Sequence, residues 1–115
     1  PIRPGKAVIS GGHNLPNAHV IHCLGPVYGR DEPSDQLLVS CYRKALELAE
    51  QHGIARIGFP AISTGVFGYP LAEAAQVALR TIRDTAPTQE AVSLVRFVLF
   101  SDADLAVFDR VLKEL

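Results

Sequence analysis

Short segments rich in strand-forming residues alternate along this chain with longer segments of helical periodicity, and no other feature limits the fold as strongly. The order is strand, strand, helix, strand, helix, strand, helix. Strands that alternate with helices predict an α/β fold with a mainly parallel sheet and helices on both of its faces. The segments expected to form strands are 5–10, which ends at a Gly11-Gly12 turn, 18–24, 55–59 and 93–100.

The first predicted helix has a recognisable beginning, apolar face and end. Short polar residues, early acids and a proline at 31–34 are typical of a helix N-terminus. Apolar residues then recur at intervals of three, four and three, as on one face of an amphipathic helix. Gly53 follows the last turn, where a left-handed residue is common. The apolar face consists of Leu38, Cys41, Ala45 and Leu48, and Asp31, Glu32 and Asp35 are expected to be surface charges at the helix entry.

Two further helices are expected, one after the loop that follows strand 55–59 and one at the end of the chain. Pro70 can open the first of them, and 86–90 reads as a polar turn after it. Asp102 is expected to cap the last helix, because a short acidic side chain accepts hydrogen bonds from first-turn amides. The expected apolar faces are Leu71, Ala74, Ala75, Ala78, Leu79 and Ile82, and then Leu105, Phe108, Val111, Leu112 and Leu115.

Size and composition predict one compact domain over residues 1–115. A chain of this length that is 48% hydrophobic can bury a core without disulfides. Lys and Arg number 11 against 12 Asp and Glu, a balance that argues against a nucleic-acid binder with a broad basic surface. No apolar run approaches the ~20 residues of a membrane helix. Two cysteines fit a reducing compartment, so we expect a cytoplasmic protein.

The histidines and cysteines predict neither a metal site nor a thiol nucleophile. His22 lies inside the strand 18–24, where we expect a hydrogen-bonded core side chain. Cys23 and Cys41 fall on a buried strand and on a helix face, where free cysteine acts as a small apolar residue. The histidines that lack a second ligand at zinc-site spacing are His13, His19 and His52.

The segment 61–69, between the third predicted strand and the second predicted helix, carries the strongest chemical signal. Ligands of open α/β sheets bind at such loops. Gly65 and Gly68 allow backbone conformations that a Cβ disfavours, so that consecutive amides can face one concavity. No Lys or Arg lies between Arg56 and Arg80, so main-chain amides would hold a phosphate or diphosphate here, unlike in a P-loop. The alternative is an ordinary glycine-containing turn.

Three strings, GKAVISGGHNLP, HVIHCLGPVYG and FPAISTGVFGYP, resemble the macrodomain, the ADP-ribose-binding fold, and most closely its MacroD-type branch. The resemblance extends from Gly5 to the last helix and implies a three-layer α/β/α fold. It also implies that loop 61–69 wraps the diphosphate and the distal ribose, with a ring from the last strand near the adenine. The implied ligand-binding residues are Ser63, Thr64, Gly65, Val66, Phe67, Gly68 and Phe100.

Several parts of that family pattern have no counterpart in residues 1–115. They are its N-terminal strands, an Asp-Ile pair that recognises adenine, an Asn-Ala-Ala-Asn segment, and a Gly-rich loop with the Asp implicated in hydrolysis. We therefore identify no catalytic residue in this chain. Central parallel strands need neighbours on both sides, so we expect a piece of a longer protein, completion by an N-terminal segment or another chain, or a homodimer.

The resemblance implies an enzyme that hydrolyses mono-ADP-ribosyl esters or deacetylates O-acetyl-ADP-ribose. The alternatives are a non-catalytic ADP-ribose reader and an assembly unit that binds no ligand. The implied partners are ADP-ribose or an ADP-ribosylated protein, with no membrane and no sequence-specific nucleic acid. No metal or redox cofactor is implied.

Overall fold

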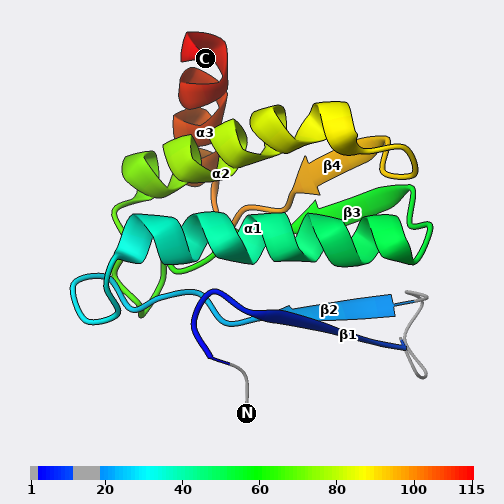
Figure 1. Ribbon diagram of the computed structural model, residues 1–115. Coiled ribbons are helices and arrows are strands. Elements are labelled where there is room, and N and C mark those ends of the chain that lie inside the picture. The colour runs from blue at the N-terminus through cyan, green and yellow to red at the C-terminus, as the bar shows by residue number, and fades with distance from the viewer. Residues whose placement is uncertain (1–2, 12–18) are drawn as a thin grey trace.

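The computed structural model describes residues 3–11 and 19–115 of the chain. Within them, strands and helices follow the predicted order, with one short 3₁₀ helix in addition (Figure 1), so the fold is α/β as predicted. The elements are β1 (Ala7–Gly11), β2 (His19–Cys23), α1 (Ser34–Gln51), β3 (Arg56–Phe59), α2 (Leu71–Thr85), η1 (Ala86–Thr88), β4 (Leu94–Phe97) and α3 (Asp102–Glu114).

The described strands form two separate two-stranded sheets rather than one continuous sheet. β1 and β2 pair antiparallel, with Ile9 opposite Ile21 at the centre of the register. β3 and β4 pair parallel, with Ile57 opposite Val95. Gly11 is the last residue of β1, so the prediction that it belongs to a turn is wrong. Gly12, the other residue of the predicted turn, lies outside the described residues.

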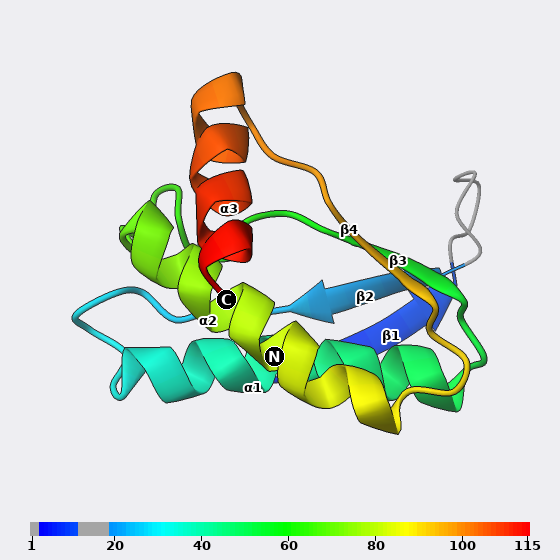
Figure 2. The same ribbon diagram turned by 90° about the horizontal axis from the view of Figure 1, so that it is seen from above.

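Helix α1 connects the two sheets. β2 and β3 both run from right to left in Figure 1, and α1 runs back in the opposite direction in front of them. α2 lies beside α1 on the same face of the strands, as the view from above shows (Figure 2), and α3 packs against α2. The ends of β2 and β3 therefore meet the beginnings of α1 and α2 at one end of the molecule.

The larger hydrophobic core lies between α1, α2 and the strands. Tyr42 of α1 is buried in it, and its ring lies 5.0 Å from that of Phe59 and 6.1 Å from that of Phe97. Burial of such apolar side chains is the main source of stability in a domain of this size. The predicted helix faces are confirmed by the buried residues Leu38, Cys41 and Ala45 in α1 and Ala74, Ala75 and Ala78 in α2.

Helix α3 buries only part of its predicted face. Phe108 packs in a second, smaller cluster, with its ring 5.0 Å from that of Phe97. Three leucines of the same predicted face are exposed, so that part of the prediction is wrong. Periodicity identifies the apolar positions of a helix, but not how much of the face has something to pack against. The exposed residues are Leu105, Leu112 and Leu115.

Glycine and proline mark the helix ends as predicted, whereas one cap differs. Gly53 has φ +66° just after α1, and Pro33 and Pro70 stand at the N-caps of α1 and α2. The N-cap of α3 is Ser101, whose hydroxyl accepts a hydrogen bond from the amide of Asp104 at 3.2 Å. The prediction of Asp102 is therefore wrong by one residue. Serine and aspartate cap equally well, so composition alone does not separate two neighbours.

Strand β2 is covered on one side only. Ile21 and Cys23 are half-buried against the core, but His22 between them is exposed, with its Nε2 3.0 Å from Ser10 Oγ. The predicted hydrogen bond of His22 is confirmed, whereas its predicted burial in the core is wrong. Both cysteines are free, and burial raises the pKa of both thiols, that of Cys41 to about 11. Both thiols therefore stay protonated near neutral pH, and both side chains pack as small apolar groups.

Candidate ligand-binding site

Two loops, 24–33 and 61–69, lie together at the end of the molecule where β2 and β3 finish, on the left of Figure 1. Loop 61–69 leads from β3 into α2, which is where open α/β sheets bind ligands. The amide of Tyr28 donates a hydrogen bond to the carbonyl of Phe67 at 2.9 Å, and the rings of Tyr28 and Tyr69 lie 4.8 Å apart. The two loops therefore form one continuous surface.

Loop 61–69 closes on itself through two main-chain hydrogen bonds. The amide of Gly68 donates to the carbonyl of Gly65 at 3.0 Å, and the amide of Tyr69 donates to the carbonyl of Ser63 at 2.9 Å. The two bonds are nested, since the first lies inside the turn that the second closes. Residues 65–68, which the inner bond encloses, form the tip of the loop.

Three amides at this tip are unpaired. The N–H groups of Gly65, Val66 and Phe67 have no acceptor among the described residues. The side chain of Val66 is 99% exposed, so the tip is open to solvent. Successive unpaired N–H groups in a turn form a partly positive concavity, which suits an anion. The free amides satisfy one requirement of the predicted main-chain anion site, and the site itself stays a prediction.

Two residues of the loop have positive φ, Ser63 at 70° and Gly68 at 76°. Glycine adopts this conformation freely, whereas serine rarely does. Gly65 does not have positive φ, and a Cβ added to it would meet no atom within 4 Å. The prediction that Gly65 is required for the backbone conformation is therefore wrong. The lack of a side chain at Gly65 therefore matters only for a ligand that approaches the loop from solvent.

Gly25 has a structural role that sequence reasoning missed. A Cβ at this position would overlap Ser63 Oγ and Ile62 Cγ2, so the end of β2 packs against loop 61–69 without room for a side chain. Ser63 Oγ is buried there and has no hydrogen-bond partner among the described residues. A buried hydroxyl without a partner is costly. The available signal was the Gly-Pro pair at 25–26, which indicates a strand end but not a close contact.

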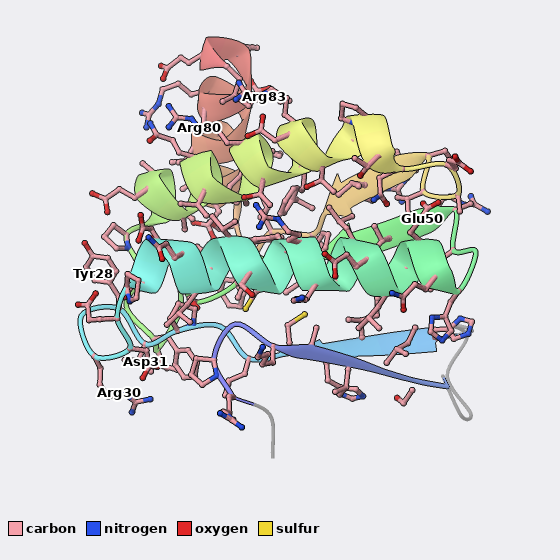
Figure 3. The ribbon with its side chains drawn as sticks, in the orientation of Figure 1. Tyr28, Arg30, Asp31, Glu50, Arg80 and Arg83 are labelled. Carbon is pink, nitrogen blue, oxygen red and sulfur yellow. The ribbon has the colours of Figure 1, made fainter. Side chains whose placement is uncertain are left out.

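Asp31 stabilises loop 24–33, where Figure 3 places it near Tyr28. Its Oδ2 accepts a hydrogen bond from the amide of Val27 at 2.8 Å and one from Arg30 Nη2 at 3.2 Å. The hydrogen bond from Val27, followed by that from Arg30, lowers the pKa of the Asp31 carboxyl. The prediction that Asp31 is a surface charge at the helix entry is therefore incomplete, because this carboxylate fixes the loop.

Tyr42 supports the base of loop 61–69 from α1. Its hydroxyl donates to the carbonyl of Pro60 at 3.5 Å and accepts from the amide of Ile62 at 3.3 Å. Burial, the largest influence, raises the pKa of this phenol far above its ordinary value, so the hydroxyl stays protonated. Its partners lie 18 and 20 residues along the chain, which is why helical periodicity could not indicate the contact.

The predicted ligand residues fall into two groups. Residues 63–68 lie together in the loop, where Phe67 is half-buried. Phe100 belongs to a separate segment, because β4 ends at Phe97 and not at 100 as predicted. The ring of Phe100 is fully exposed, and no described residue covers it.

Loop 61–69 contains no acidic or basic residue. Among residues 3–11 and 19–115, no three His, Cys, Asp or Glu side chains are placed to hold a metal ion. The rings of His19 and His52 lie 5.8 Å apart, and His13 falls outside the described residues. In that same part of the chain, no helix is long and apolar enough to cross a bilayer.

Curated proteins and a family model match this chain closely. The model of the Macro domain matches residues 1–78. Macro domain-containing protein CT2219 of Chlorobaculum tepidum is 43% identical over 109 residues, which are 94% of this chain and 63% of that protein. An O-acetyl-ADP-ribose deacetylase of Klebsiella pneumoniae is 42% identical over 110 residues, 95% of this chain and 63% of that protein. The chain thus spans less than two thirds of these relatives.

Solved structures show the same likeness. The Oceanobacillus iheyensis macrodomain with ADP superposes with a TM-score of 0.92 at 40% identity, over 97% of this chain and 59% of that one. A Trypanosoma brucei macrodomain in complex with ADP-ribose gives 0.85 at 33% identity, over 94% and 45%. These likenesses confirm the predicted macrodomain fold.

Proposed function

Because this chain belongs to the Macro domain family, we propose that it binds ADP-ribose through loop 61–69. The observation that carries the proposal is the row of unpaired amides at 65–67. Diphosphate oxygens are hydrogen-bond acceptors with negative charge, so they are suitable partners for these three donors. Two of the macrodomain structures similar to this chain are described with ADP or ADP-ribose, which supports this choice of ligand.

The main chain supplies most of the proposed contacts. The amides of 65–67 hold the diphosphate oxygens, and the N-terminus of α2 adds a partial positive charge nearby. The hydroxyl of Ser63 is buried against Gly25 and has no partner among the described residues, so it becomes a further donor at this turn only when the side chain rotates toward the ligand. The hydroxyl of Thr64 instead donates to the carbonyl of Ala61 at 2.9 Å, so it shapes the turn. Gly68 supports the turn in the same way through its positive φ.

Aromatic and apolar side chains have a second role. In the proposed complex, Val66 and Phe67 lie against the distal ribose, and the exposed ring of Phe100 stacks on the adenine. Single exposed apolar side chains are common on protein surfaces, so the support for Phe100 is its full exposure together with the family resemblance. These contacts would add buried surface area and fix the orientation of the ligand, while the main-chain amides stabilise the negative charge of its diphosphate.

We propose further that the complete domain hydrolyses esters of ADP-ribose. The Klebsiella pneumoniae relative named O-acetyl-ADP-ribose deacetylase supports a reaction of this class. Hydrolysis needs a water molecule near the distal ribose and a group that activates it. Loop 61–69 has no acid or base, so the activating group has to come from elsewhere in the complete domain. A reader without catalysis and an assembly unit without ligand are the alternatives.

Calorimetric titration with ADP-ribose tests the binding site, and Gly65→Glu is the informative variant. The protein has room for a side chain at this position, so the fold is preserved, while a carboxylate enters the anion site. We expect affinity to fall about a hundredfold or more, which corresponds to roughly 2.7 kcal/mol. Gly11→Glu is the matched control, because a Cβ there also meets no atom within 4 Å. Unchanged affinity in Gly65→Glu would exclude this loop as the site.

Two product assays separate the functional alternatives. Release of ADP-ribose from an automodified protein, or of acetate from O-acetyl-ADP-ribose, identifies a hydrolase. Binding without either release identifies a reader. No heat of binding at high protein concentration identifies an assembly unit, and in that case the proposed ligand site is wrong for this chain.

A further inference from the structure

A pair of histidines lies at the end of the molecule opposite to loop 61–69. His19 is the first residue of β2, and His52 is the C-cap residue of α1. β2 begins and α1 ends on the right of Figure 1. Both side chains are exposed, and both border the cavity of about 1030 Å³ that lies between β2 and β3. An ion in solvent can therefore reach both imidazole rings.

The distance between the two rings suits a shared metal ion. The ring centres of His19 and His52 lie 5.8 Å apart, and the ring planes make an angle of 63°. Imidazole nitrogen binds zinc at about 2.0–2.1 Å, so two rings on one such ion have centres about 4.5 to 6.3 Å apart as the angle between the two bonds widens from a right angle to a straight line. The observed separation lies within this range.

The ring of His52 is oriented by the helix that it ends. Its Nδ1 lies 2.9 Å from the carbonyl oxygen of Leu48. A carbonyl oxygen can only accept a hydrogen bond, so Nδ1 carries the proton and donates, which leaves the lone pair on Nε2. Metal-binding histidines donate the N–H of one ring nitrogen to a carbonyl or carboxylate in the same way, and this bond fixes the ring for coordination through the other nitrogen.

The charge at the end of α1 also favours a cation. The last carbonyl groups of a helix carry a partial negative charge, and α1 is 18 residues long. Every residue of its last turn is described, and none of them is a Lys or Arg that would offset this charge. The imidazole of His52 therefore lies where a divalent cation is attracted.

We infer that His19 and His52 together bind one divalent transition-metal ion. Imidazole suits Ni²⁺, Cu²⁺ and Zn²⁺, whereas Mg²⁺ and Ca²⁺ prefer oxygen ligands. Among residues 3–11 and 19–115, no three His, Cys, Asp or Glu side chains are placed to hold an ion, so water fills its remaining positions. The two ligands lie far apart in the sequence, which is why ligand spacing along the chain did not indicate the site. The inference does not depend on ADP-ribose.

Calorimetric titration with NiCl₂ tests the site, in buffer at pH 8, where free imidazole is neutral. We expect one Ni²⁺ per chain, with affinity at least tenfold lower in His19→Gln and in His52→Gln. His22→Gln is the matched control, because His22 is an exposed histidine of the same strand whose Nε2 lies 3.0 Å from Ser10 Oγ, and it should bind Ni²⁺ normally. Equal affinity in all three variants, or no binding by the natural chain, would overturn the inference.

Two further titrations identify the ligand chemistry. Cys23→Ser should bind Ni²⁺ as the natural chain does, although the half-buried Cys23 borders the same cavity. An excess of MgCl₂ should not displace Ni²⁺, because Mg²⁺ prefers oxygen ligands. Loss of binding in Cys23→Ser would identify a thiolate site, and displacement by Mg²⁺ would identify carboxylate ligands, so either result would overturn the inference. Circular dichroism verifies that all variants remain folded.

Discussion

Two regions of this molecule present unpaired main-chain groups, and the pattern of those groups differs between them. At the tip of loop 61–69, three successive amides have no acceptor among the described residues. Between β2 and β3, a cavity is bounded by two strand edges. Successive amides of a turn can bind one anion, whereas the main-chain groups of a strand edge point alternately to opposite sides of the strand.

The regions also differ in what surrounds them. The loop is supported from below by the hydroxyl of Tyr42 and from the side by Gly25, and its tip projects into solvent. The cavity is lined by core-packing side chains such as Ile21 and Ile57 together with exposed residues such as His19, Arg56 and Val98. A small, charged ligand can reach the tip of the loop without desolvating much surface. The difference shows that unpaired backbone identifies a site only when its pattern and surroundings are considered together.

The largest predicted effect separates the loop from the rest of the molecule. Gly65→Glu should lower ADP-ribose affinity about a hundredfold, whereas Gly11→Glu at the end of β1 should leave it unchanged. A Cβ at either position meets no atom within 4 Å, so both variants should fold. Calorimetry with ADP-ribose measures both. An equal loss of affinity in the two variants would show that loop 61–69 is not the specific site.

Tyr42→Phe should destabilise the fold and weaken the loop in particular. The variant removes a buried hydroxyl that bonds to Pro60 and Ile62, at a cost of about 1 kcal/mol in the free energy of unfolding. Urea denaturation measures this cost. The control is Tyr28→Phe, whose hydroxyl is exposed and 3.4 Å from Glu73, and it should change stability very little. Equal stability of both variants would mean that the Tyr42 hydroxyl does not support the loop.

Ser63→Gly should separate stability from ligand binding. Glycine adopts φ of 70° without strain, and the change also removes a buried unpaired hydroxyl. We expect a gain of up to about 1 kcal/mol in the free energy of unfolding, together with weaker ADP-ribose binding because a donor is lost. Chemical denaturation and calorimetry measure the two quantities. A variant that is more stable and binds as tightly as before would remove Ser63 from the ligand site.

The smallest effect on either region is expected from Glu50, at the opposite end of α1 from Tyr28 (Figure 3). Its carboxylate accepts hydrogen bonds from the amides of Ala91, Glu90 and Val92, and these, that of Ala91 first, lower the pKa of Glu50 from its ordinary 4.5. A carboxyl whose pKa falls on folding stabilises the fold above its ordinary pKa. That contribution is lost as the pH falls below 4.5 through the lowered value.

Glu50→Gln should therefore reduce stability at pH 7, and its difference from the natural chain should shrink in acid. Denaturation at pH 7 and pH 3 measures this difference. Asp84→Asn is the control, because the Asp84 carboxylate is exposed and pairs only with the neighbouring Arg83. ADP-ribose affinity should stay unchanged in both variants. A stability difference for Glu50→Gln that persists at pH 3 would show that charge is not the cause.

Features set by neighbouring residues were predictable from the sequence. The helix faces of α1 and α2 follow from apolar spacing, Gly53 from the geometry of a helix end, and loop 61–69 from its glycines and prolines. The macrodomain fold followed from longer strings, and the comparisons confirm it. Each of these features depends on a short stretch of chain, which is all that periodicity and local composition describe.

Features that depend on distant residues were not predictable. Gly25 is required because Ser63 and Ile62 approach it, and Glu50 is fixed by amides about 40 residues away. The exposed leucines of α3 and the exposed His22 have the same explanation, since apolar or strand-like spacing does not reveal which neighbours are present. The division of the strands into two sheets is likewise a matter of long-range pairing.

The most direct test of the ligand site is an NMR titration of this chain with ADP-ribose, with the amides of Gly65, Val66 and Phe67 as probes. We predict saturable shifts of these amide protons to lower field, as expected when each donates to a phosphate oxygen, with much smaller changes at His22 and Glu50. Saturable shifts elsewhere, with these three amides unaffected, would contradict the proposed anion site.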